Sequence, residues 1–514
     1  MDDWWKGAVI YQIYPRSFAD SDGDGVGDLR GILARLDHLA DLGVDAVWIS
    51  PIYPSPMADF GYDVSDYTGI HPMFGTMDDF DALVAGVHAR GLKLLLDFVP
   101  GHTSEAHPWF EASRSSKDDP KRGWYTWRDA RDGGPPTNWI AEFGGPAWEW
   151  DAATGQYYHH AFLPEQPNLN WRNPEAVAAL MDAMRFWYDR GVDGFRVDAF
   201  EQGGADPEAG NNPPNPDWTS AMNDAESLRP VNTKHQPVVF DMARRMRAVA
   251  GEYAPERLLV GEIYANPVTL ARYYGDAAGA MFQLPFNFAL IDMAWDAGTI
   301  GAFVEEYEAA LPPDGWPSWV LGNHDRARMA TRFGAQRVRA ALTLLLTLRG
   351  TPTLYYGEEI GMGNVDVPPD RVQDPWELRV PGKGFGRDVV RTPMPWERGP
   401  GMGFTSGDPW LPLGAPEEGT VAEQAAREDS TLAFTKRLLR LRRDTEALRV
   451  GGIEVLGWAD DVLRYVRTSG GDRVEVAVNF AAAPRPAPEG TVLLSTHAGE
   501  GDLRPDEARV VRVG

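Results

Sequence analysis

The sequence predicts an α/β fold: a (β/α)8 barrel of the TIM type with a small insert domain after strand 3 and a C-terminal antiparallel β-domain. Three observations support it. Eight short apolar segments alternate with amphipathic segments of helical period. A long aperiodic stretch interrupts this alternation after the third strand, and short alternating segments with turn signals end the chain. No glycine-rich dinucleotide fingerprint follows the first strand, so a closed barrel is favoured over an open doubly wound sheet.

The barrel strands are expected in order along the chain. They lie at residues 8–15, 45–51, 92–100, 194–200, 257–264, 280–286, 317–325 and 351–361. Amphipathic helical segments lie at residues 29–43, 76–91, 173–191, 239–254, 298–311, 335–350 and 430–448. Strands that lead into helices are the repeating unit of such a barrel.

The long interruption after strand three and the C-terminal segments divide the chain into four parts. Residues 1–101 and 171–448 are expected to form the barrel, 102–170 the insert domain, and 449–514 the β-domain. The insert is rich in Trp, Pro, Gly and His and is too long for an ordinary loop. A second irregular stretch, 362–428, lies between strand eight and the last helix.

The bulk composition excludes several classes of protein. With 514 residues, 43% of them hydrophobic, the chain can bury a large core. A net charge of −26 repels phosphate backbones and anionic lipid, so neither nucleic acid nor a membrane is expected as a partner. The chain has no cysteine for a disulfide or thiolate site, and MDDWWKGAVIYQ lacks the features of a signal peptide. A cytoplasmic location is expected.

The segment GFRVDAF (194–200) places Arg196 and Asp198 in an otherwise apolar strand, where charges are costly unless paired or used. Because strand side chains alternate, both lie on one face. In a barrel, side chains at the carboxyl ends of strands meet at one rim. We therefore expect Arg196 to face the barrel mouth and to keep Asp198 ionised by lowering its pKa.

Other strand ends carry matching polar groups. Glu262 ends strand five, His324 and Asp325 end strand seven, and Asp97 ends strand three. Retaining glycoside hydrolysis needs an ionised carboxylate and a protonated carboxyl group roughly 5–5.5 Å apart, which suits Asp198 and Glu262. The alternative is an Arg–Asp ion pair that only closes the barrel end; it is favoured for a lone RxD strand but not for the whole set.

These residues also complete a family pattern. The segments DFVPGHTS (97–104), GFRVDAF (194–200), GEIY (261–264) and GNHD (322–325) resemble the four motif regions of the α-amylase family of retaining glycosidases. Four more segments resemble its α-glucosidase and oligo-1,6-glucosidase branch, which acts on short oligosaccharides: YQIYPRSFADSDGDGVGDLRGI (11–32), GYDVSDY (61–67), FGTMDDF (74–80) and RTPMPW (391–396). The resemblance covers nearly the whole chain.

The resemblance implies catalytic roles. Asp198 is the nucleophile, Glu262 the general acid/base, and Asp325 the carboxylate that grips the sugar hydroxyls as the ring distorts. Arg196 supports the nucleophile and belongs to the expected substrate-binding residues, and Asp97 lies beneath as a structural partner. No organic cofactor is needed, and the partner is a small neutral oligosaccharide.

The resemblance also implies five side chains around the terminal glucose: Asp59, Tyr62, His102, His324 and Arg387. Tyr62 is an aromatic platform, and the two histidines bond the same sugar. Asp59 and Arg387 close the pocket behind the glucose, which makes the enzyme exo-acting. Arg391 is the second choice for that arginine.

The loop DSDGDGVGD resembles a cation site. Its oxygen donors have EF-hand-like spacing, without the closing glutamate: Asp20, Asp22, Asp24, the Val26 carbonyl and Asp28. The branch resemblance favours a structural Ca²⁺ or Mg²⁺, and the alternative is an acidic solvated turn. Gly101 stands where much of the family has an asparagine that ligates calcium, which argues against a calcium between barrel and insert.

The expected function is that of an exo-acting retaining α-glucosidase. Ala199, after the nucleophile, resembles the branch members that prefer α-1,4 (maltose-type) substrates. A transglycosylating or isomerising relative, trehalose synthase-like or sucrose-acting, is the main alternative, and a non-catalytic binding subunit is a remote one. Trp109 and Trp139 suit either sugar stacking or the core of the insert, of which the core is the stronger interpretation.

Overall fold

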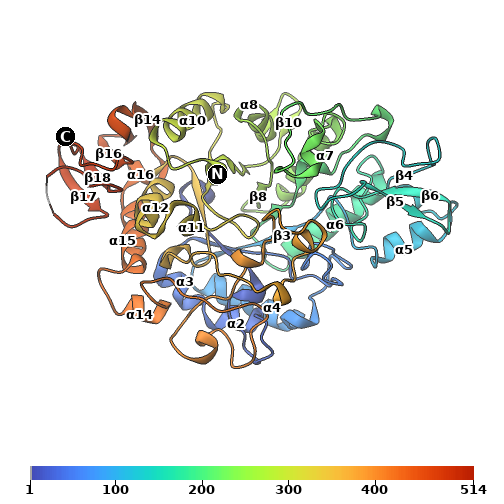
Figure 1. Ribbon diagram of the computed structural model, residues 1–514, viewed down its shortest axis with the longest axis horizontal. Helices are drawn as coiled ribbons and strands as arrows, with labels where there is room; N and C mark the ends of the chain where they lie inside the picture. Colours follow the sequence, from blue (N-terminus) through green and yellow to red (C-terminus); the bar gives the residue numbers. More distant parts are fainter. Residues whose placement is uncertain (1–2, 500, 514) are drawn as a thin grey trace.

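The computed structural model describes residues 3–499 and 501–513. The barrel lies in the middle of an elongated molecule, between the insert domain (cyan) and the C-terminal β-domain (red), as Figure 1 shows. Met1, Asp2, Glu500 and Gly514, which belong to the outer predicted parts, lie outside the described residues. The insert and the β-domain therefore flank the barrel on opposite sides.

Eight parallel strands form the barrel and confirm the predicted fold class. The sheet order is β11-β8-β7-β3-β2-β1-β13-β12. The strands are β1 (Ile10–Ile13), β2 (Ala46–Ile49), β3 (Lys93–Phe98), β7 (Gly194–Val197), β8 (Leu258–Gly261), β11 (Leu284–Pro285), β12 (Ser318–Val320) and β13 (Thr351–Tyr355). A parallel bridge between Asn287 and Trp319 joins the two ends of the sheet and closes the barrel.

The sixth strand is shorter than expected, for a local reason. The sequence predicted residues 280–286, but β11 has two residues. The side chain of Gln283 accepts a hydrogen bond from the Leu259 amide at 3.0 Å, so a side chain takes the place of backbone pairing there. The amide of Gln283 also donates to the Arg257 carbonyl.

Helices surround the barrel. The main ones are α2 (Leu29–Ala34), α3 (Leu36–Leu42), α4 (Met77–Ala89), α6 (Pro174–Asp189), α7 (Pro237–Ala250), α10 (Ala297–Ala310), α12 (Val338–Thr347) and α15 (Thr431–Asp444). Helix α4 illustrates their cause: Thr76 and Asp79 form a capping box, and the apolar side chains Phe80, Leu83 and Val87 recur at helical spacing on its buried face.

Shorter elements complete the barrel. The helices are α1 (Trp4–Gly7), α8 (Pro267–Ala271), α9 (Ala289–Asp292), α11 (Met329–Phe333), α13 (Pro375–Arg379), α14 (Val421–Ala425) and α16 (Glu446–Val450). Strands β9 (Gly275–Asp276) and β10 (Gly279–Ala280) form a small hairpin. No helix of the described residues has the length and apolar character needed to cross a membrane.

Two antiparallel sheets flank the barrel. The insert holds α5 (Pro108–Ser115) and a sheet of β4 (Trp127–Arg128), β6 (Gln156–His159) and β5 (Trp148–Asp151). The C-terminal sheet has the order β14 (Gly452–Gly457), β15 (Val462–Ser469), β16 (Asp472–Asn479), β18 (Ala508–Arg512) and β17 (Thr491–Ser495). Buried Arg467 on β15 joins this sheet to the barrel, because it donates to the Thr347 carbonyl of α12 at 2.6 Å.

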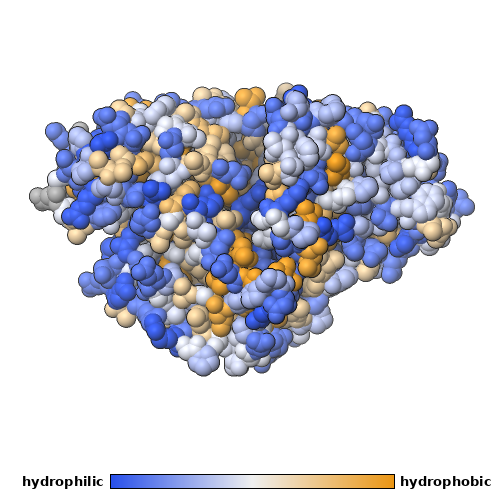
Figure 2. Space-filling model, in the orientation of Figure 1, coloured by the Kyte–Doolittle hydropathy of each residue, from blue (hydrophilic) through white to orange (hydrophobic). Residues whose placement is uncertain are grey.

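A third irregular segment, which the sequence analysis did not single out, follows β7. Residues 201–236 run to α7 through short 3-10 turns at Phe200–Gln202, Pro207–Ala209 and Asp224–Ser227. The face of the molecule drawn in Figure 2 is mostly hydrophilic, with apolar residues in narrow patches. The segment 201–236 lies against the insert domain: Asn138 and Asn212 exchange hydrogen bonds of 2.9 Å.

Candidate active site

A cavity of about 500 Å³ opens at the carboxyl ends of the barrel strands. Most of the predicted site residues line it: Asp59, Tyr62, His102, Asp198, Glu262, His324, Asp325 and Arg387. Arg196 and Asp97, 1% and 0% exposed, are buried behind them. Side chains of the insert and of residues 201–236 form the opposite wall, so the cavity lies where three parts of the chain meet.

Arg196 joins the carboxyl groups of three neighbouring strands. Its Nη1 lies 2.6 Å from Asp97 Oδ1 and 2.8 Å from Asp198 Oδ1, and its Nη2 lies 2.6 Å from Glu262 Oε2. The strand register explains the convergence, because Arg196 on β7 pairs with Asp97 on β3 and with Val260 on β8. A single buried guanidinium thus orients both carboxyl groups that the sequence predicts to be catalytic, and the charges of GFRVDAF are paired.

Burial controls the protonation of these carboxyl groups. It raises the pKa of Glu262 to about 8, and the charges of Asp198 and Asp325 add to the rise, although Arg196 lowers it. The expected lowering of the Asp198 pKa is wrong in its net direction: burial raises that pKa to about 7, and Arg196 only partly compensates. Glu262 is therefore the carboxyl group that keeps its proton to the higher pH.

The backbone after Asp198 is strained and holds Glu262 in place. Ala199 has a φ of 39° in the left-handed region, a conformation that costs a non-glycine residue about 1 kcal/mol or more. Its N–H donates to Glu262 Oε2 at 2.6 Å, and the Phe200 N–H donates to the Glu262 carbonyl at 3.1 Å. The strain aligns both amides with Glu262, so the two carboxyl groups are positioned as one unit.

Asp325 lies between two arginines. Arg391 Nη2 is 2.9 Å and Arg387 Nη1 is 3.4 Å from Asp325 Oδ1. Burial alone would raise the pKa of Asp325, but His324, Arg387 and Arg391 outweigh it and hold this pKa below its usual value. Asp325 is thus the carboxylate that stays ionised when Asp198 and Glu262 take up protons.

The structure separates the two arginine candidates. Arg387 lines the cavity, and its Nη2 lies 2.8 Å from Asp59 Oδ1. Arg391 is fully buried and donates from Nε to the His324 carbonyl at 2.8 Å. Arg387 is thus the arginine that pairs with Asp59 at the cavity wall.

Two residues that sequence reasoning missed hold this pair. Buried Asp374 accepts from Arg387 Nη2 at 2.6 Å and from its backbone amide at 2.8 Å. The Gln166 amide donates to Asp59 Oδ2 at 3.3 Å. Asp374 lies in an aperiodic stretch and Gln166 at the end of the insert, so neither follows a barrel strand that could have pointed to it.

Tyr62 and the two histidines form the remaining wall. The Tyr62 hydroxyl lies 2.6 Å from His324 Nε2, and the two rings are nearly parallel, with 5° between their planes. The Gln12 amide lies 2.8 Å from the other ring nitrogen of His324, and His102 Nε2 lies 3.0 Å from the Tyr62 carbonyl. We call Asp59, Tyr62, His102, His324 and Arg387 the glucose end of the cavity, because the sequence analysis expects them around a terminal glucose.

The opposite part of the cavity is the acceptor end, which we define by Glu142, Glu201 and Lys234 and the lining residues Asn212 and Thr233. These residues belong to the insert and to residues 201–236. Sequence reasoning missed all of them because no periodicity or strand end marks them.

The two tryptophans considered at the sequence level pack inside the insert. Trp139 is 2% exposed, stacks on Trp148 and donates to the Gly210 carbonyl at 3.1 Å, although it also forms part of the cavity wall. Trp109 packs edge-on against Trp124 with ring centroids 5.0 Å apart. These contacts suit the interpretation of both as core.

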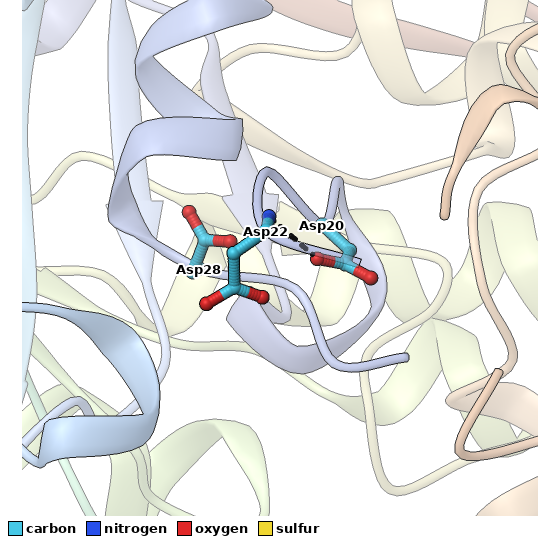
Figure 3. Close-up of side chains that lie close together, drawn as sticks. All are labelled: Asp20, Asp22 and Asp28. Carbon is cyan, nitrogen blue, oxygen red and sulfur yellow. Dashed lines mark hydrogen bonds between the residues drawn. The ribbon is translucent and has the colours of Figure 1, made fainter. Parts of the chain in front are cut away.

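The acidic loop brings three of its predicted donors together. Figure 3 shows the side chains of Asp20, Asp22 and Asp28 close together. One carboxylate oxygen of each lies within 4.8 Å of the other two, and Asp24 is not part of this group. Asp28 also caps α2 by accepting from the Gly31 amide at 2.7 Å. Three hard oxygen donors fit Ca²⁺ or Mg²⁺. Burial and the neighbouring carboxylates raise the pKa of Asp24.

The chain resembles known proteins over nearly its whole length. Residues 12–451 match the model of the alpha-amylase catalytic domain. The chain is 40% identical over 496 residues to a probable alpha-glucosidase of Rhizobium meliloti (strain 1021), covering 93% of this chain and 90% of that one. It is 38% identical over 517 residues to an oligo-1,6-glucosidase of Parageobacillus thermoglucosidasius, with coverage of 93% and 90%.

Solved structures agree with these sequence matches. An alpha-glucosyl transfer enzyme superposes with a TM-score of 0.94 at 41% identity, covering 100% of both chains. The trehalulose synthase of Pseudomonas mesoacidophila MX-45 superposes with a TM-score of 0.91 at 33% identity, again over 100% of both chains.

Proposed function

The chain belongs to the alpha-amylase family of glycoside hydrolases, and we propose that it is an exo-acting retaining α-glucosidase that releases α-glucose from the non-reducing end of short α-glucosides. The observation that carries this proposal is the single Arg196 guanidinium that orients both Asp198 and Glu262. Two carboxyl groups placed together at a cavity are what double displacement requires.

In the first step Asp198 attacks the anomeric carbon as the glycosidic bond breaks. The departing oxygen takes the proton of Glu262, and a covalent glucosyl-Asp198 intermediate forms. The raised pKa of Glu262 supports this role, because a group with a pKa of about 8 still carries its proton near neutral pH. Positive charge that develops at the anomeric carbon is stabilised by the ionised Asp325 nearby.

In the second step the Glu262 carboxylate takes a proton from water, and the resulting nucleophile attacks the anomeric carbon. The bond to Asp198 breaks, Glu262 is protonated again, and glucose leaves with the α configuration because the carbon has been inverted twice. The bond to the water oxygen replaces the bond to Asp198, and the proton that water loses returns Glu262 to its starting state.

The exo action rests on the glucose end. The ion pair of Arg387 with Asp59 at 2.8 Å, held from behind by Asp374, blocks the cavity beyond one sugar unit. Tyr62 and the two histidines would contact the ring that fills this end. A neutral oligosaccharide with one free non-reducing glucose is the substrate that fits.

A preference for α-1,4 linkages is the finer part of the proposal. It is supported by the small side chain of Ala199, which follows the nucleophile and is part of the cavity wall. A methyl-sized difference changes specificity by only about 1–3 kcal/mol, so maltose and isomaltose should both be accepted at different rates.

Proton NMR of maltose with the purified protein tests this proposal. We expect the α-glucose signal to appear before mutarotation. In Asp198→Asn we expect neither release of glucose nor consumption of maltose. Release of β-glucose would exclude the retaining mechanism, and maltose without maltotriose as the first product from maltotetraose would exclude single-unit exo action.

Glucosyl transfer or isomerisation is a second candidate function. The likeness to an alpha-glucosyl transfer enzyme and to a trehalulose synthase favours it, since the same covalent intermediate can be captured by a sugar. The same NMR experiment separates the two functions: new glucosidic signals from maltose or sucrose indicate transfer or isomerisation, and free glucose indicates hydrolysis.

We also propose a structural Ca²⁺ or Mg²⁺ at the acidic loop. Asp20, Asp22 and Asp28 would hold it, with Asp24 and the Val26 carbonyl as the other predicted donors. The loop contacts residues 404–410, because the Thr405 hydroxyl donates to Asp20 and the Trp410 amide donates to the Gly25 carbonyl. Such an ion would neutralise the acidic loop and stabilise this contact, without taking part in catalysis.

A further inference from the structure

The acceptor end contains a buried ion cluster that the proposed mechanism does not use. We propose that Lys234, positioned by Glu201 and Glu142, is a specificity-determining residue that donates hydrogen bonds to the hydroxyl groups of the leaving or incoming sugar. The inference rests on the proposed glucosidase function and extends it from the glucose unit to the neutral polyhydroxyl acceptor.

Glu201 is the first observation. It is 0% exposed, and neither of its carboxylate oxygens has a hydrogen-bond partner within residues 3–499 and 501–513. Leaving a buried carboxylate unsatisfied is costly, so a nearby cation is required. The cation is Lys234, whose Nζ lies 3.7 Å from Glu201 Oε1. Burial raises the pKa of Glu201 to about 7, while Lys234 lowers it.

Lys234 is the second observation. Its Nζ also lies 3.3 Å from Glu142 Oε1. The ammonium therefore lies between Glu142 of the insert and Glu201, which follows β7. Its side chain is 23% exposed and forms part of the cavity wall. An ammonium has three N–H donors, and two long contacts leave donor capacity toward the cavity.

The position of the cluster connects it to the reaction. Glu201 lies three residues after Asp198, in the 3-10 turn whose Phe200 amide is bonded to the Glu262 carbonyl. Gln202 donates to Glu142 at 3.0 Å, which ties the same turn to the insert. The cluster therefore stands beside the catalytic carboxyl groups, on the side away from the glucose end.

The charges indicate the class of ligand. Two carboxylates and one ammonium, next to the catalytic carboxyl groups, give a negative wall that disfavours anionic acceptors. Sugar hydroxyls can accept hydrogen bonds from Lys234 and donate to Glu142. The side-chain amide of Asn212 and the hydroxyl of Thr233, in the same wall, can also bond neutral hydroxyl groups. A neutral sugar or polyol is the ligand that these groups recognise.

The test compares two substrates that share the glucose but differ in leaving group. Maltose has a sugar at the acceptor end, whereas α-glucosyl fluoride has only fluoride there. In Lys234→Met we expect kcat/KM for maltose to fall about tenfold, since one charge-assisted hydrogen bond is lost, and that for the fluoride to stay within about twofold. Transfer from the fluoride to added glucose should fall by a similar factor.

Two further variants keep the test decisive. Glu201→Gln should show the same maltose-specific loss to a smaller extent. Lys234→Arg should lose less activity on maltose than Lys234→Met. Lys383→Met is the matched control, because Lys383 pairs with Asp224 of the same segment at 2.8 Å but does not line the cavity. The control should leave both substrates unchanged.

Equal losses on both substrates in Lys234→Met, or no loss on either, would overturn the inference. A wild-type protein that acts on neither maltose nor the fluoride would instead contradict the proposed function itself. If Lys234→Met does not fold, as judged by circular dichroism and thermal unfolding, Glu201→Gln and Lys234→Arg decide the question by the same ratio of substrates.

Discussion

The two ends of the cavity are held together by different contacts. The glucose end is fixed by short ion pairs between irregular segments, with Arg387 bonded to both Asp59 and Asp374 at 2.8 and 2.6 Å. The acceptor end is formed by the insert and residues 201–236, where Lys234 reaches its partners only at 3.3 and 3.7 Å. The difference indicates that the glucose end is held in one arrangement by short ion pairs, whereas the acceptor end is held by longer contacts.

This comparison predicts how variants should divide. A change at the nucleophile Asp198 or at the glucose end should affect every α-glucoside in the same way, because all of them place the same sugar there. The acid/base Glu262 is the exception, because leaving groups differ in their need for its proton. A change at the acceptor end should depend on the leaving group.

The largest effect is expected for Asp198→Asn. The variant keeps the shape but removes the nucleophile, so kcat/KM should fall at least about 10³-fold for maltose and for α-glucosyl fluoride alike. Steady-state rates on both substrates check this. Asp189→Asn, an exposed site on α6 that bonds Tyr253, is the control. A loss confined to maltose would contradict the assignment of Asp198 as nucleophile.

Glu262→Gln should divide the two substrates in a different way. Maltose needs protonation of its leaving oxygen and fluoride needs little, so we expect kcat/KM to fall by roughly 10²–10⁴ for maltose and far less for the fluoride. Glu256→Gln is the matched control, because Glu256 lies just before the first residue of β8, whereas Glu262 follows its last residue. A similar loss on both substrates would argue against Glu262 as the acid.

The pH profile of kcat/KM follows from the same two groups. Asp198 must be ionised, and its pKa of about 7 predicts that activity falls as the pH drops below that value. Glu262 must be protonated, and its pKa of about 8 predicts that activity falls as the pH rises above it. The basic limb should disappear in Glu262→Gln assayed with the fluoride, and its persistence would assign that limb to another group.

A smaller loss is expected for Arg387→Lys at the glucose end. Lysine keeps one charge but cannot bond Asp59 and Asp374 together, so we expect kcat/KM to fall about 10²-fold on both substrates. Arg398→Lys, an exposed pair with Glu423, is the control. If maltose were affected and the fluoride were not, Arg387 would belong functionally to the acceptor end.

The sequence predicted the catalytic centre because its signals are local, whereas Asp59, Tyr62 and Arg387 of the glucose end were predicted from the family resemblance. Hydrophobic periodicity located the strands, and polar residues such as Asp198 and Glu262 stand at their ends. It missed Glu201 and Lys234 because their segment has neither periodicity nor a motif. The pKa of Asp198 was misjudged for a related reason: the neighbouring Arg196 is visible in the sequence, whereas burial depends on the whole fold.

The smallest effect on catalysis is expected from removing a bound cation, which separates the acidic loop from both ends of the cavity. Thermal unfolding with EDTA should lower the melting temperature by a few degrees relative to added Ca²⁺ or Mg²⁺, since ligand at 100 times its Kd stabilises by ~2.7 kcal/mol. The ratio of maltose to fluoride activity should stay constant, because Asp20, Asp22 and Asp28 do not line the cavity. Asp22→Asn should abolish the cation dependence. An unchanged melting temperature would leave the loop as an acidic turn closed by its own backbone amides, such as the Gly23 and Gly25 N–H groups that already bond Asp20.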